Sequence, residues 1–370
     1  MAVQVIGMIG VAPPADNATV HIIDGGVDPR YLVEFSRAHD DAGFDLVLVG
    51  YTSTSADGWE VATHAAAHTN DVGYLIAHRP GFVSPTLAAR KAATFDQLSG
   101  GRFALHIIAG ASDRDQRRDG DYLDKADRYA RAGEYIDIMR RTWTSDAPFD
   151  VAGRFYTMTD VRSDVRPLQH PSPPVFFGGS SNEALTMGAE HCDVYAVFGE
   201  PLAATAERFE DFRARAATFG RRATFSISFR PILGRTEGEA WDRAGRILAA
   251  IENENPERGQ PHDHSGQRML AHAATADVHD ERLWMKVAEA TGAPGNTSCL
   301  VGTAEQVADA LLEYYKLGDL SHVLLRGFDP LPDAREFGSE LIPRLKAGAL
   351  ALDQTALDQT ALEQERIPAP

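Results

Sequence analysis

The feature that most limits how this chain can fold is a series of short apolar runs that alternate with longer segments of helical pattern. Most runs are rich in Val, Ile, Leu or Phe, and many end at Gly, which is typical of parallel strands buried on both faces. Repeated strand–helix order favours parallel pairing with right-handed crossovers. The eight runs are Val3–Gly10, Leu46–Gly50, Gly73–His78, Phe103–Gly110, Val175–Gly179, Val194–Gly199, Thr224–Leu233 and His322–Phe328.

Eight such units predict an α/β protein of the (β/α)8 TIM-barrel type, with its active site at the C-terminal ends of the strands. Two segments are longer than a minimal barrel needs. Residues 112–165, after the fourth strand, predict a helix followed by a small hairpin. Residues 252–296, after the seventh strand, are irregular and lie over the predicted mouth, which is typical of a lid; a plain surface insertion is the alternative.

A third unusual segment, Ala351–Glu365, repeats ALDQT, ALDQT and ALEQE. On a helix, five residues advance about 140° beyond a full turn, so the three leucines spiral around the axis and form no single apolar face. One interpretation is a tail without fixed structure. The other is an arm on a neighbouring subunit, which is favoured because leucine is a poor residue to leave in water. We therefore expect a barrel domain at 1–346, a tail or oligomerisation arm at 347–370, and a homodimer or homotetramer.

The charge balance excludes several kinds of partner. The chain has 36 Lys and Arg against 53 Asp and Glu, a net charge of −17. Such a chain is a poor binder of a phosphate backbone, so we expect no nucleic-acid partner. The first ten residues lack the basic region and apolar core of a signal peptide, and no apolar stretch has the length of a membrane span. We therefore expect a cytoplasmic protein with no membrane partner.

The sequence lacks the motifs of several common metal-binding, nucleotide-binding and hydrolase sites. The two cysteines, Cys192 and Cys299, match no metal spacing. His64 and His68 are four residues apart but lack a third ligand, so packing or surface roles are favoured over a metal site. The sequence contains no G-x-G-x-x-G, no G-x-x-x-x-G-K-[ST] and no G-x-S-x-G. A Rossmann nicotinamide site, a P-loop and a hydrolase nucleophile elbow are therefore not indicated.

The fifth strand ends in a turn that is suited to a phosphate. Gly178 and Gly179 allow a tight turn, and Ser180 and Ser181 place hydroxyls at the start of the helix that begins near Asn182. Unsatisfied N–H groups at a helix N-terminus favour an anion. The alternative is an ordinary serine N-cap after a glycine turn, and this motif alone does not decide between them.

Three arginines from three strand ends form the second signal. Arg79, Arg230 and Arg326 are expected to converge on one cavity and to bind an oxyanion such as a sulfonate or phosphate. The alternative is a structural ion pair for each arginine, which is less favoured for three together than for one. Phe328 and Trp59 are candidates for the apolar wall of the same pocket.

Together these residues resemble the bacterial-luciferase-like flavin monooxygenases, and within that family the two-component alkanesulfonate monooxygenases. The matching segments are Arg79–Arg102, Asp127–Tyr129, Pro171–Ser181, His191–Pro201 and Cys299–Leu311. The resemblance implies the barrel, reduced FMN as a dissociable co-substrate, O2 as oxidant and an NAD(P)H-dependent flavin reductase as partner. It also implies that Tyr129, Ser180 and Ser181 hold the FMN phosphate and that His106 lies near the flavin ring.

Departures from the family pattern concern the substrate contacts. His106 stands where the subgroup often has Asn, and Ser55 stands where its alkanesulfonate enzymes have an active-site Cys. Arg230 occupies the His position of their Arg-x-His pair, and Phe328, preceded by Arg326, replaces their Tyr. The resemblance then implies a small anionic sulfonate other than a simple alkyl one, such as the sugar sulfonate sulfoquinovose, with cleavage of its C–S bond to an aldehyde and sulfite.

Several roles and functions stay open at this level. Arg230, Arg326 and His106 are the candidate catalytic residues, while Arg79, Arg230, Arg326, Phe328, Ser55 and Trp59 are the candidate substrate contacts. The general base is open among His78, His106 and a histidine of the 252–296 segment. The alternative functions are a flavin monooxygenase for a sulfone, amine or polyaminocarboxylate, a deazaflavin-dependent dehydrogenase on the same barrel, a flavin-binding protein without catalysis, and a metal hydrolase.

Overall fold

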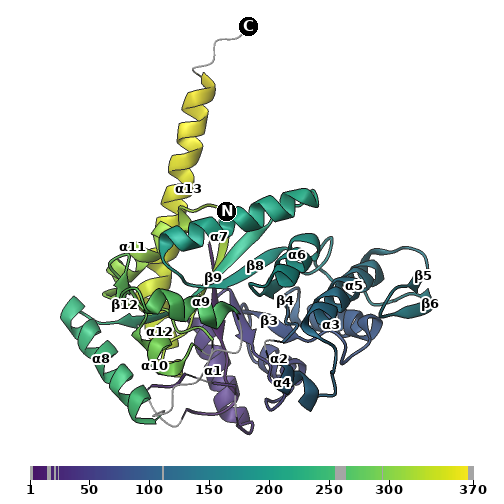
Figure 1. Ribbon diagram of the computed structural model, residues 1–370, viewed down its shortest axis with the longest axis horizontal. Helices are drawn as coiled ribbons and strands as arrows, with labels where there is room; N and C mark the ends of the chain where they lie inside the picture. Colours follow the sequence, from purple (N-terminus) through teal and green to yellow (C-terminus); the bar gives the residue numbers. More distant parts are fainter. Residues whose placement is uncertain are drawn as a thin grey trace.

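The computed structural model describes residues 3–14, 18–20, 22–23, 25–110, 112–254, 264–293 and 295–365. Eight parallel strands form a closed barrel, because β9 pairs with both β8 and β13, and β13 pairs with β1 (Figure 1). The closed barrel and each of the eight predicted strands are thus confirmed. The strands are β1 (Gln4–Met8), β2 (Leu46–Val49), β3 (Gly73–His78), β4 (Phe103–Ile107), β7 (Val175–Gly178), β8 (Val194–Phe198), β9 (Thr224–Leu233) and β13 (Leu320–Leu325).

Helices cover the outside of the barrel, and two layers of apolar residues hold the strands in place. Inside the barrel, Ile6, Leu75, Ala104, Phe176 and Val194 form one cluster, and a larger cluster lies between the strands and the helices. Burial on both faces is the reason that these strands read as continuous apolar runs. The outer helices are α1 (Pro29–Asp41), α2 (Gly58–Ala66), α3 (Pro85–Ser99), α6 (Asn182–His191), α7 (Leu202–Thr218), α11 (Ala304–Tyr315) and α12 (Pro330–Glu336).

The segment after β4 folds as the sequence predicts, with a helix and a hairpin. A short helix, α4 (Asp113–Arg118), precedes the long helix α5 (Lys125–Thr144). Strands β5 (Phe149–Ala152) and β6 (Thr157–Val161) then form an antiparallel hairpin at the edge of the molecule (Figure 1). Helix α5 packs against α3 and α6, so it places Tyr129 beside the start of α6.

The segment after β9 is more regular than the sequence indicates. Helix α8 (Glu237–Glu254) is followed by α9 (His264–Ala273), β10 (Val278–His279), β11 (Leu283–Trp284), α10 (Lys286–Thr291) and β12 (Cys299–Gly302). Strand β12 pairs in parallel with Arg230–Leu233, the second half of β9, and β11 pairs antiparallel with β12. The predicted lid, residues 252–296, therefore contributes β10 and β11 to a small sheet that joins the barrel wall through β12, while 255–263 and residue 294 of that segment lie outside the described residues.

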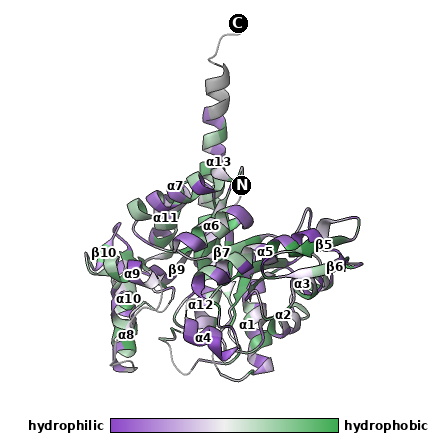
Figure 2. Ribbon diagram, turned by 45° about the vertical axis from the view of Figure 1, so that its right-hand side comes forward, coloured by the Kyte–Doolittle hydropathy of each residue, from purple (hydrophilic) through white to green (hydrophobic). Residues whose placement is uncertain are grey.

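The C-terminal repeat lies in one helix, α13 (Ile342–Glu365), which continues the π-helical turn η1 (Phe337–Leu341). Leu345 and Ala349 are buried, and Tyr315 donates a 2.7 Å hydrogen bond to Asp353. Beyond this point the helix projects away from the barrel (Figure 1), with alternating hydrophobic and hydrophilic residues (Figure 2). Leu350 and Leu357 are 63% and 65% exposed.

Within the described residues, no helix combines the length and the hydrophobicity that crossing a lipid bilayer requires.

Candidate active site

The turn at the end of β7, Gly178–Ser181, requires a glycine at position 179. A Cβ atom on Gly179 would lie 2.8 Å from the Cβ of Ala184 and 3.1 Å from the hydroxyl of Tyr129, and the φ angle of Gly179 is +153°. A side chain there would therefore clash and strain the backbone. We call Gly178–Ser181 the cradle; the structure brings the predicted residue Tyr129 against it.

The hydroxyls of the cradle face the starts of two helices. Ser181 is the N-cap of α6 and accepts a 3.4 Å hydrogen bond from the N–H of Ala184. Ser180 lies with its Oγ 3.1 Å from the Oγ of Ser265, in the first turn of α9. Hydrogen bonds from its own backbone N–H and from Ser181 lower the pKa of the exposed Glu183. The start of α6 thus already holds a carboxylate, as expected for an anion-binding helix terminus.

His106 lies next to the cradle at the end of β4. Its Nε2 atom would be 3.8 Å from a Cβ on Gly178. Its Nδ1 atom is buried and has no hydrogen-bond partner within the described part of the chain. Burial lowers the pKa of His106 to about 4, so the ring is neutral near pH 7. An orphaned ring nitrogen beside a cradle is a feature that a bound ligand would satisfy.

Arg79, at the end of β3, is paired with carboxylates of the chain itself. It contacts Asp115 and lies 3.4 Å from Asp119, both at α4, and its guanidinium lies 4.6 Å from the centre of the Tyr51 ring. Tyr51 donates a 2.9 Å hydrogen bond to the same Asp119. Ser53 also donates to Asp115, so α4 is fastened over the ends of β2 and β3. Of the two interpretations of Arg79, oxyanion binding or a structural ion pair, the structure shows the ion pair.

Arg230 is completely buried and donates hydrogen bonds to backbone carbonyls. Its Nε atom donates to Asn296 (2.8 Å) and its Nη atoms donate to Thr19, Val20 and Gly327 at 3.0, 2.6 and 3.2 Å. Burial lowers the pKa of Arg230 to about 10, which leaves it charged near pH 7. The residue therefore connects three mouth segments: the β1–α1 loop, the β13–α12 loop and the chain before β12.

Arg326, at the end of β13, has the more open environment. It donates to the carbonyl of Val20 and lies 3.2 Å from the sulfur of Met8. Its Nε atom is buried with no partner among the described residues. Arg326 and Arg230 meet at Val20, whereas Arg79 shares no hydrogen-bond partner with either of them in the described ranges.

The remaining predicted substrate contacts make packing or local contacts. Phe328 is 1% exposed and its ring centre lies 4.5 Å from the guanidinium of Arg230. Trp59 is buried against Phe95 and Phe103 on the outer side of the strands. The hydroxyl of Ser55 accepts from the N–H of Thr52 and donates to the Thr52 carbonyl within one turn.

His78, a candidate general base, has both ring nitrogens in use. Its Nδ1 atom accepts from the indole N–H of Trp59 at 3.4 Å, and its Nε2 atom lies 2.7 Å from the hydroxyl of Tyr135. Tyr135 donates onward to the carbonyl of Val83. Because burial also lowers the pKa of His78 to about 4, it forms a neutral, internally satisfied link between α2, β3 and α5.

A buried acidic residue just after β8 was not predicted from the sequence. Glu200 is 1% exposed and pairs with Arg208 of α7 and Arg268 of α9. Burial alone would raise the pKa of Glu200, but hydrogen bonds and charge from the arginines outweigh it and lower the pKa. Its place directly after a buried strand was the available signal, because mouth residues of a barrel come from such positions.

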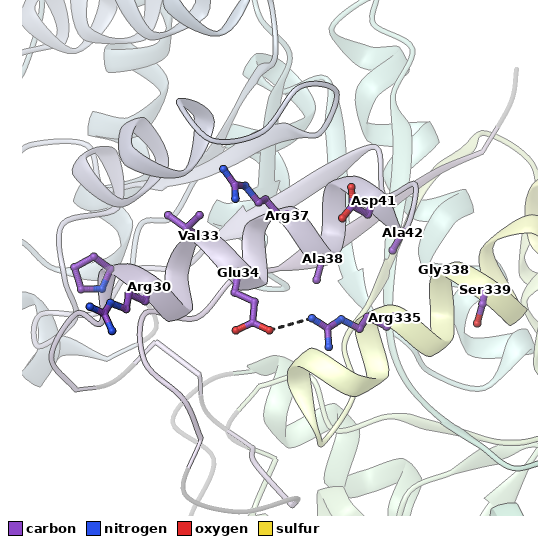
Figure 3. Close-up of a pocket in the computed structure, with 11 residues that line it drawn as sticks. Arg30, Val33, Glu34, Arg37, Ala38, Asp41, Ala42, Arg335, Gly338 and Ser339 are labelled. Atoms are coloured by element: carbon purple, nitrogen blue, oxygen red, sulfur yellow. Dashed lines mark hydrogen bonds and ion pairs between the residues drawn. The ribbon is translucent and has the colours of Figure 1, made fainter.

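Two other features lie away from the cradle. A hollow of about 800 Å³ on the outside of the barrel, between α1 and η1, is lined by Arg30, Arg37 and Ser339 among others and crossed by the 3.0 Å ion pair of Arg335 with Glu34 (Figure 3). It contains no strand-end residue, so we place the active site at the mouth instead. His64 and His68 have ring centres 4.7 Å apart, and the described residues contain no cluster of three metal-ligating side chains.

Residues 8–321 match the sequence profile described as luciferase-like monooxygenase. The chain belongs to this family. The luciferase-like monooxygenase fold is also that of solved structures of 16% to 19% identity. EDTA monooxygenase from Chelativorans sp. BNC1 is 18% identical, with 94% of each chain covered and a TM-score of 0.74. Riboflavin lyase, solved with modified FMN and riboflavin, is 19% identical, with 93% of this chain and 92% of that chain covered and a TM-score of 0.72.

A further similar structure is an F420-dependent secondary alcohol dehydrogenase in complex with an F420-acetone adduct. It is 16% identical, with 93% of this chain and 99% of that chain covered and a TM-score of 0.68. At such identities the likeness shows the fold alone. The substrate and cofactor of this monooxygenase therefore have to be argued from its own residues.

Proposed function

We propose that this chain is the oxygenase component of a two-component flavin monooxygenase that uses reduced FMN and O2. The observation that carries the proposal is the cradle, with Tyr129 against Gly179 and the unpartnered Nδ1 of His106 beside Gly178. Ser180, Ser181 and Tyr129 would hold the FMN phosphate, and His106 would face the ring. When bound, reduced FMN supplies the two electrons with which O2 is activated.

The residues of the chain have three tasks in this proposal. The N–H groups at the start of α6 and the serine hydroxyls bind the phosphate without a cationic side chain. His106 stays neutral because of burial, so it offers a hydrogen bond to the ring without adding charge. Helix α9, which contacts the cradle through Ser265, keeps water away from the mouth. A separate NAD(P)H-dependent reductase supplies the reduced flavin, since a Rossmann motif is missing from the sequence.

For the substrate we propose an organosulfonate, a polar or sugar sulfonate such as sulfoquinovose included. The support is Arg326, whose buried Nε has no partner in the described part of the chain and lies at a strand end. In the overall reaction the C–S bond breaks, one atom of O2 enters the aldehyde, the other leaves as water, and sulfur leaves as sulfite. Arg326 would bind the sulfonate oxygens.

A second substrate class has its own support. Asp115 and Asp119 already neutralise Arg79, and Arg230 is committed to four carbonyls, so the mouth carries less free positive charge than three open arginines would. This favours an uncharged sulfone or a cationic amine, whereas a polyaminocarboxylate would have to bring a cation of its own. A deazaflavin-dependent dehydrogenase on the same barrel is the alternative for the cofactor.

The test is aerobic turnover with an FMN reductase, FMN and a panel of sulfonates, sulfones, amines and polyaminocarboxylates. Release of sulfite from a sulfonate supports the first class, and oxygen-dependent product without sulfite supports the second. Fluorescence titration with reduced FMN and with a reduced deazaflavin decides the cofactor. Arg326→Met should raise KM for a sulfonate more than for a sulfone of similar size, whereas the outer-surface variant Arg335→Met should change neither. Binding of deazaflavin in place of FMN would overturn the proposal.

A further inference from the structure

We propose that Arg268 of α9 is a positioning residue that fastens the insertion to the cradle, so that docking of α9 and binding of a phosphate at the cradle strengthen each other. This inference rests on the proposed FMN site and adds to it a coupling between two parts of the mouth. It starts from Glu200, the buried carboxylate at the end of β8.

Glu200 joins two helices that are far apart in the sequence. The guanidinium of Arg268 donates from Nε to Oε1 at 2.9 Å and from Nη2 to Oε2 at 2.6 Å, a two-point contact. Arg208 of α7 donates to the same Oε1 at 2.9 Å, and His272 of α9 lies 3.7 Å from Oε2. A carboxylate that is 1% exposed needs such partners, since an unpaired buried charge is strongly destabilising.

The same network reaches the cradle in two further steps. Arg208 donates from Nε and Nη2 to the hydroxyl of Tyr195, at 2.8 and 2.6 Å. Tyr195 in turn donates a 2.7 Å hydrogen bond to the carbonyl of Gly179. Each donor in this chain has one defined acceptor, so the position of the Gly179 peptide is tied through Arg208 and Glu200 to Arg268.

A second set of contacts joins α9 directly to the same place. Ser265 lies 3.1 Å from Ser180, and Met269 is fully buried with its sulfur 3.5 Å from the hydroxyl of Ser298. Docked in this way, the first turn of α9 meets Ser180, the residue directly before the N-cap of α6. Two helix N-termini and two serine hydroxyls at one point favour a phosphate dianion over a neutral group.

The contact can also open. The side chain of Arg268 is 44% exposed, against 10% for Arg208 and 1% for Glu200, so Arg268 can leave the pair while Arg208 still neutralises Glu200. If α9 docks more firmly when the phosphate is present, then the phosphate binds more tightly when α9 is docked, because such coupling is reciprocal. Removal of the Arg268 side chain should therefore uncouple the docking of α9 from phosphate binding at the cradle.

The test compares Arg268→Met with Arg282→Met. Arg282 belongs to the same insertion and also pairs with a glutamate, Glu237, but on the side of α8 and away from the cradle. Affinities of the full chain are measured for FMN and for riboflavin, which lacks the phosphate. We expect Arg268→Met to weaken FMN about tenfold, within the usual range of coupling between sites, with less than about a twofold change for riboflavin. Arg268→Lys, which keeps the charge without the two-point contact, should lie between.

Amide hydrogen exchange over residues 264–273 gives the second measurement. In the unliganded protein, Arg268→Met should speed exchange in α9 and Arg282→Met should not, and FMN should protect α9 in the wild type and in Arg282→Met but not in Arg268→Met. Equal loss of FMN and riboflavin affinity, or α9 exchange that is unchanged in Arg268→Met, would overturn the coupling. A wild-type chain that binds no flavin would instead overturn the proposed function and the phosphate half of this inference, while unliganded exchange still tests the docking of α9.

Discussion

The side chains of Arg230 and Arg326 donate hydrogen bonds to the same acceptor, the carbonyl oxygen of Val20. The two arginines come from neighbouring strands, β9 and β13, and Val20 belongs to the loop between β1 and α1. Although they share this acceptor, the two arginines differ in their other hydrogen bonds. Arg230 donates to four backbone carbonyls and connects three segments of the mouth, while the buried Nε of Arg326 has no partner among the described residues and is available to a ligand.

Arg230→Met should destabilise the protein strongly. The substitution leaves four carbonyls without their charged donor, one in a buried and three in part-buried contacts, and a buried acceptor that loses its partner costs about 1–3 kcal/mol. We expect a decrease of at least about 3 kcal/mol in the free energy of unfolding, measured by urea denaturation. Arg235→Met, which removes an arginine that is 90% exposed, should stay within about 0.5 kcal/mol of the wild type. An Arg230→Met variant with wild-type stability would show that these hydrogen bonds contribute little.

Glu183→Gln should strengthen the binding of FMN. The carboxylate of Glu183 uses the N–H and hydroxyl groups at the start of α6, and its charge repels a phosphate there. The amide removes the charge, so the dissociation constant of FMN should fall while that of riboflavin stays unchanged. Fluorescence titration of both flavins measures the difference. Weaker FMN binding in the variant would mean that the phosphate lies elsewhere.

Buried histidines should make the protein sensitive to acid. Burial lowers the pKa of His39 from 6.5 to about 4, so the native ring stays neutral while the unfolded chain takes up a proton. The stability that this residue contributes is present above pH 6.5 and is lost as the pH falls from about 6.5 to about 4, by about 3 kcal/mol in all.

His39→Asn keeps a donor for the carbonyl of Phe35 and removes the titrating group. Urea unfolding between pH 4 and pH 7 should therefore show a flatter decline for this variant than for the wild type. His64→Asn, at an exposed position of α2, should keep the wild-type slope. Equal slopes for all three proteins would exclude His39 as a source of acid sensitivity.

Removal of the projecting part of α13 should change assembly and leave the barrel intact. We propose that this part, with exposed Leu357, is an arm that binds a second copy of the chain. A chain that ends after Asp353 keeps the hydrogen bond with Tyr315 and should unfold at a similar urea concentration. Sedimentation should show a smaller assembly than that of the full chain. An unchanged mass would show that the arm is not needed for assembly.

The barrel could be predicted from the sequence because its strands are buried on both faces. Runs such as Gly73–His78 are apolar throughout, and that signal depends on local composition alone. Strand β12 carries the same signal over Cys299–Gly302, but it pairs with the distal half of β9 outside the barrel. The prediction counted eight alternating strand–helix units, so it did not include this extra strand.

The candidate site was predictable in position but not in its contacts. The sequence assigned Arg79, Arg230 and Arg326 to strand ends; in the structure Arg79 follows β3, Arg326 follows β13, and Arg230 lies within β9. Their partners lie far away in the sequence, 36 and 40 residues for Arg79 and 210 for Arg230 with Val20. The direction of a long side chain depends on which carboxylate or carbonyl the fold brings near, and no periodicity encodes that. Glu200 was missed for the same reason, since its arginines come from α7 and α9.

Strand β9 belongs to two sheets, and Arg230 is the residue at which it changes from one to the other. Pairing with β13 ends at Phe229, and pairing with β12 begins at Arg230. The chain that leaves the insertion is therefore hydrogen-bonded to the barrel wall as β12 and is not a free loop. A movement of the insertion as one rigid body would have to break this strand pairing, whereas α9, which forms no strand pairing within the described residues, could move without breaking it.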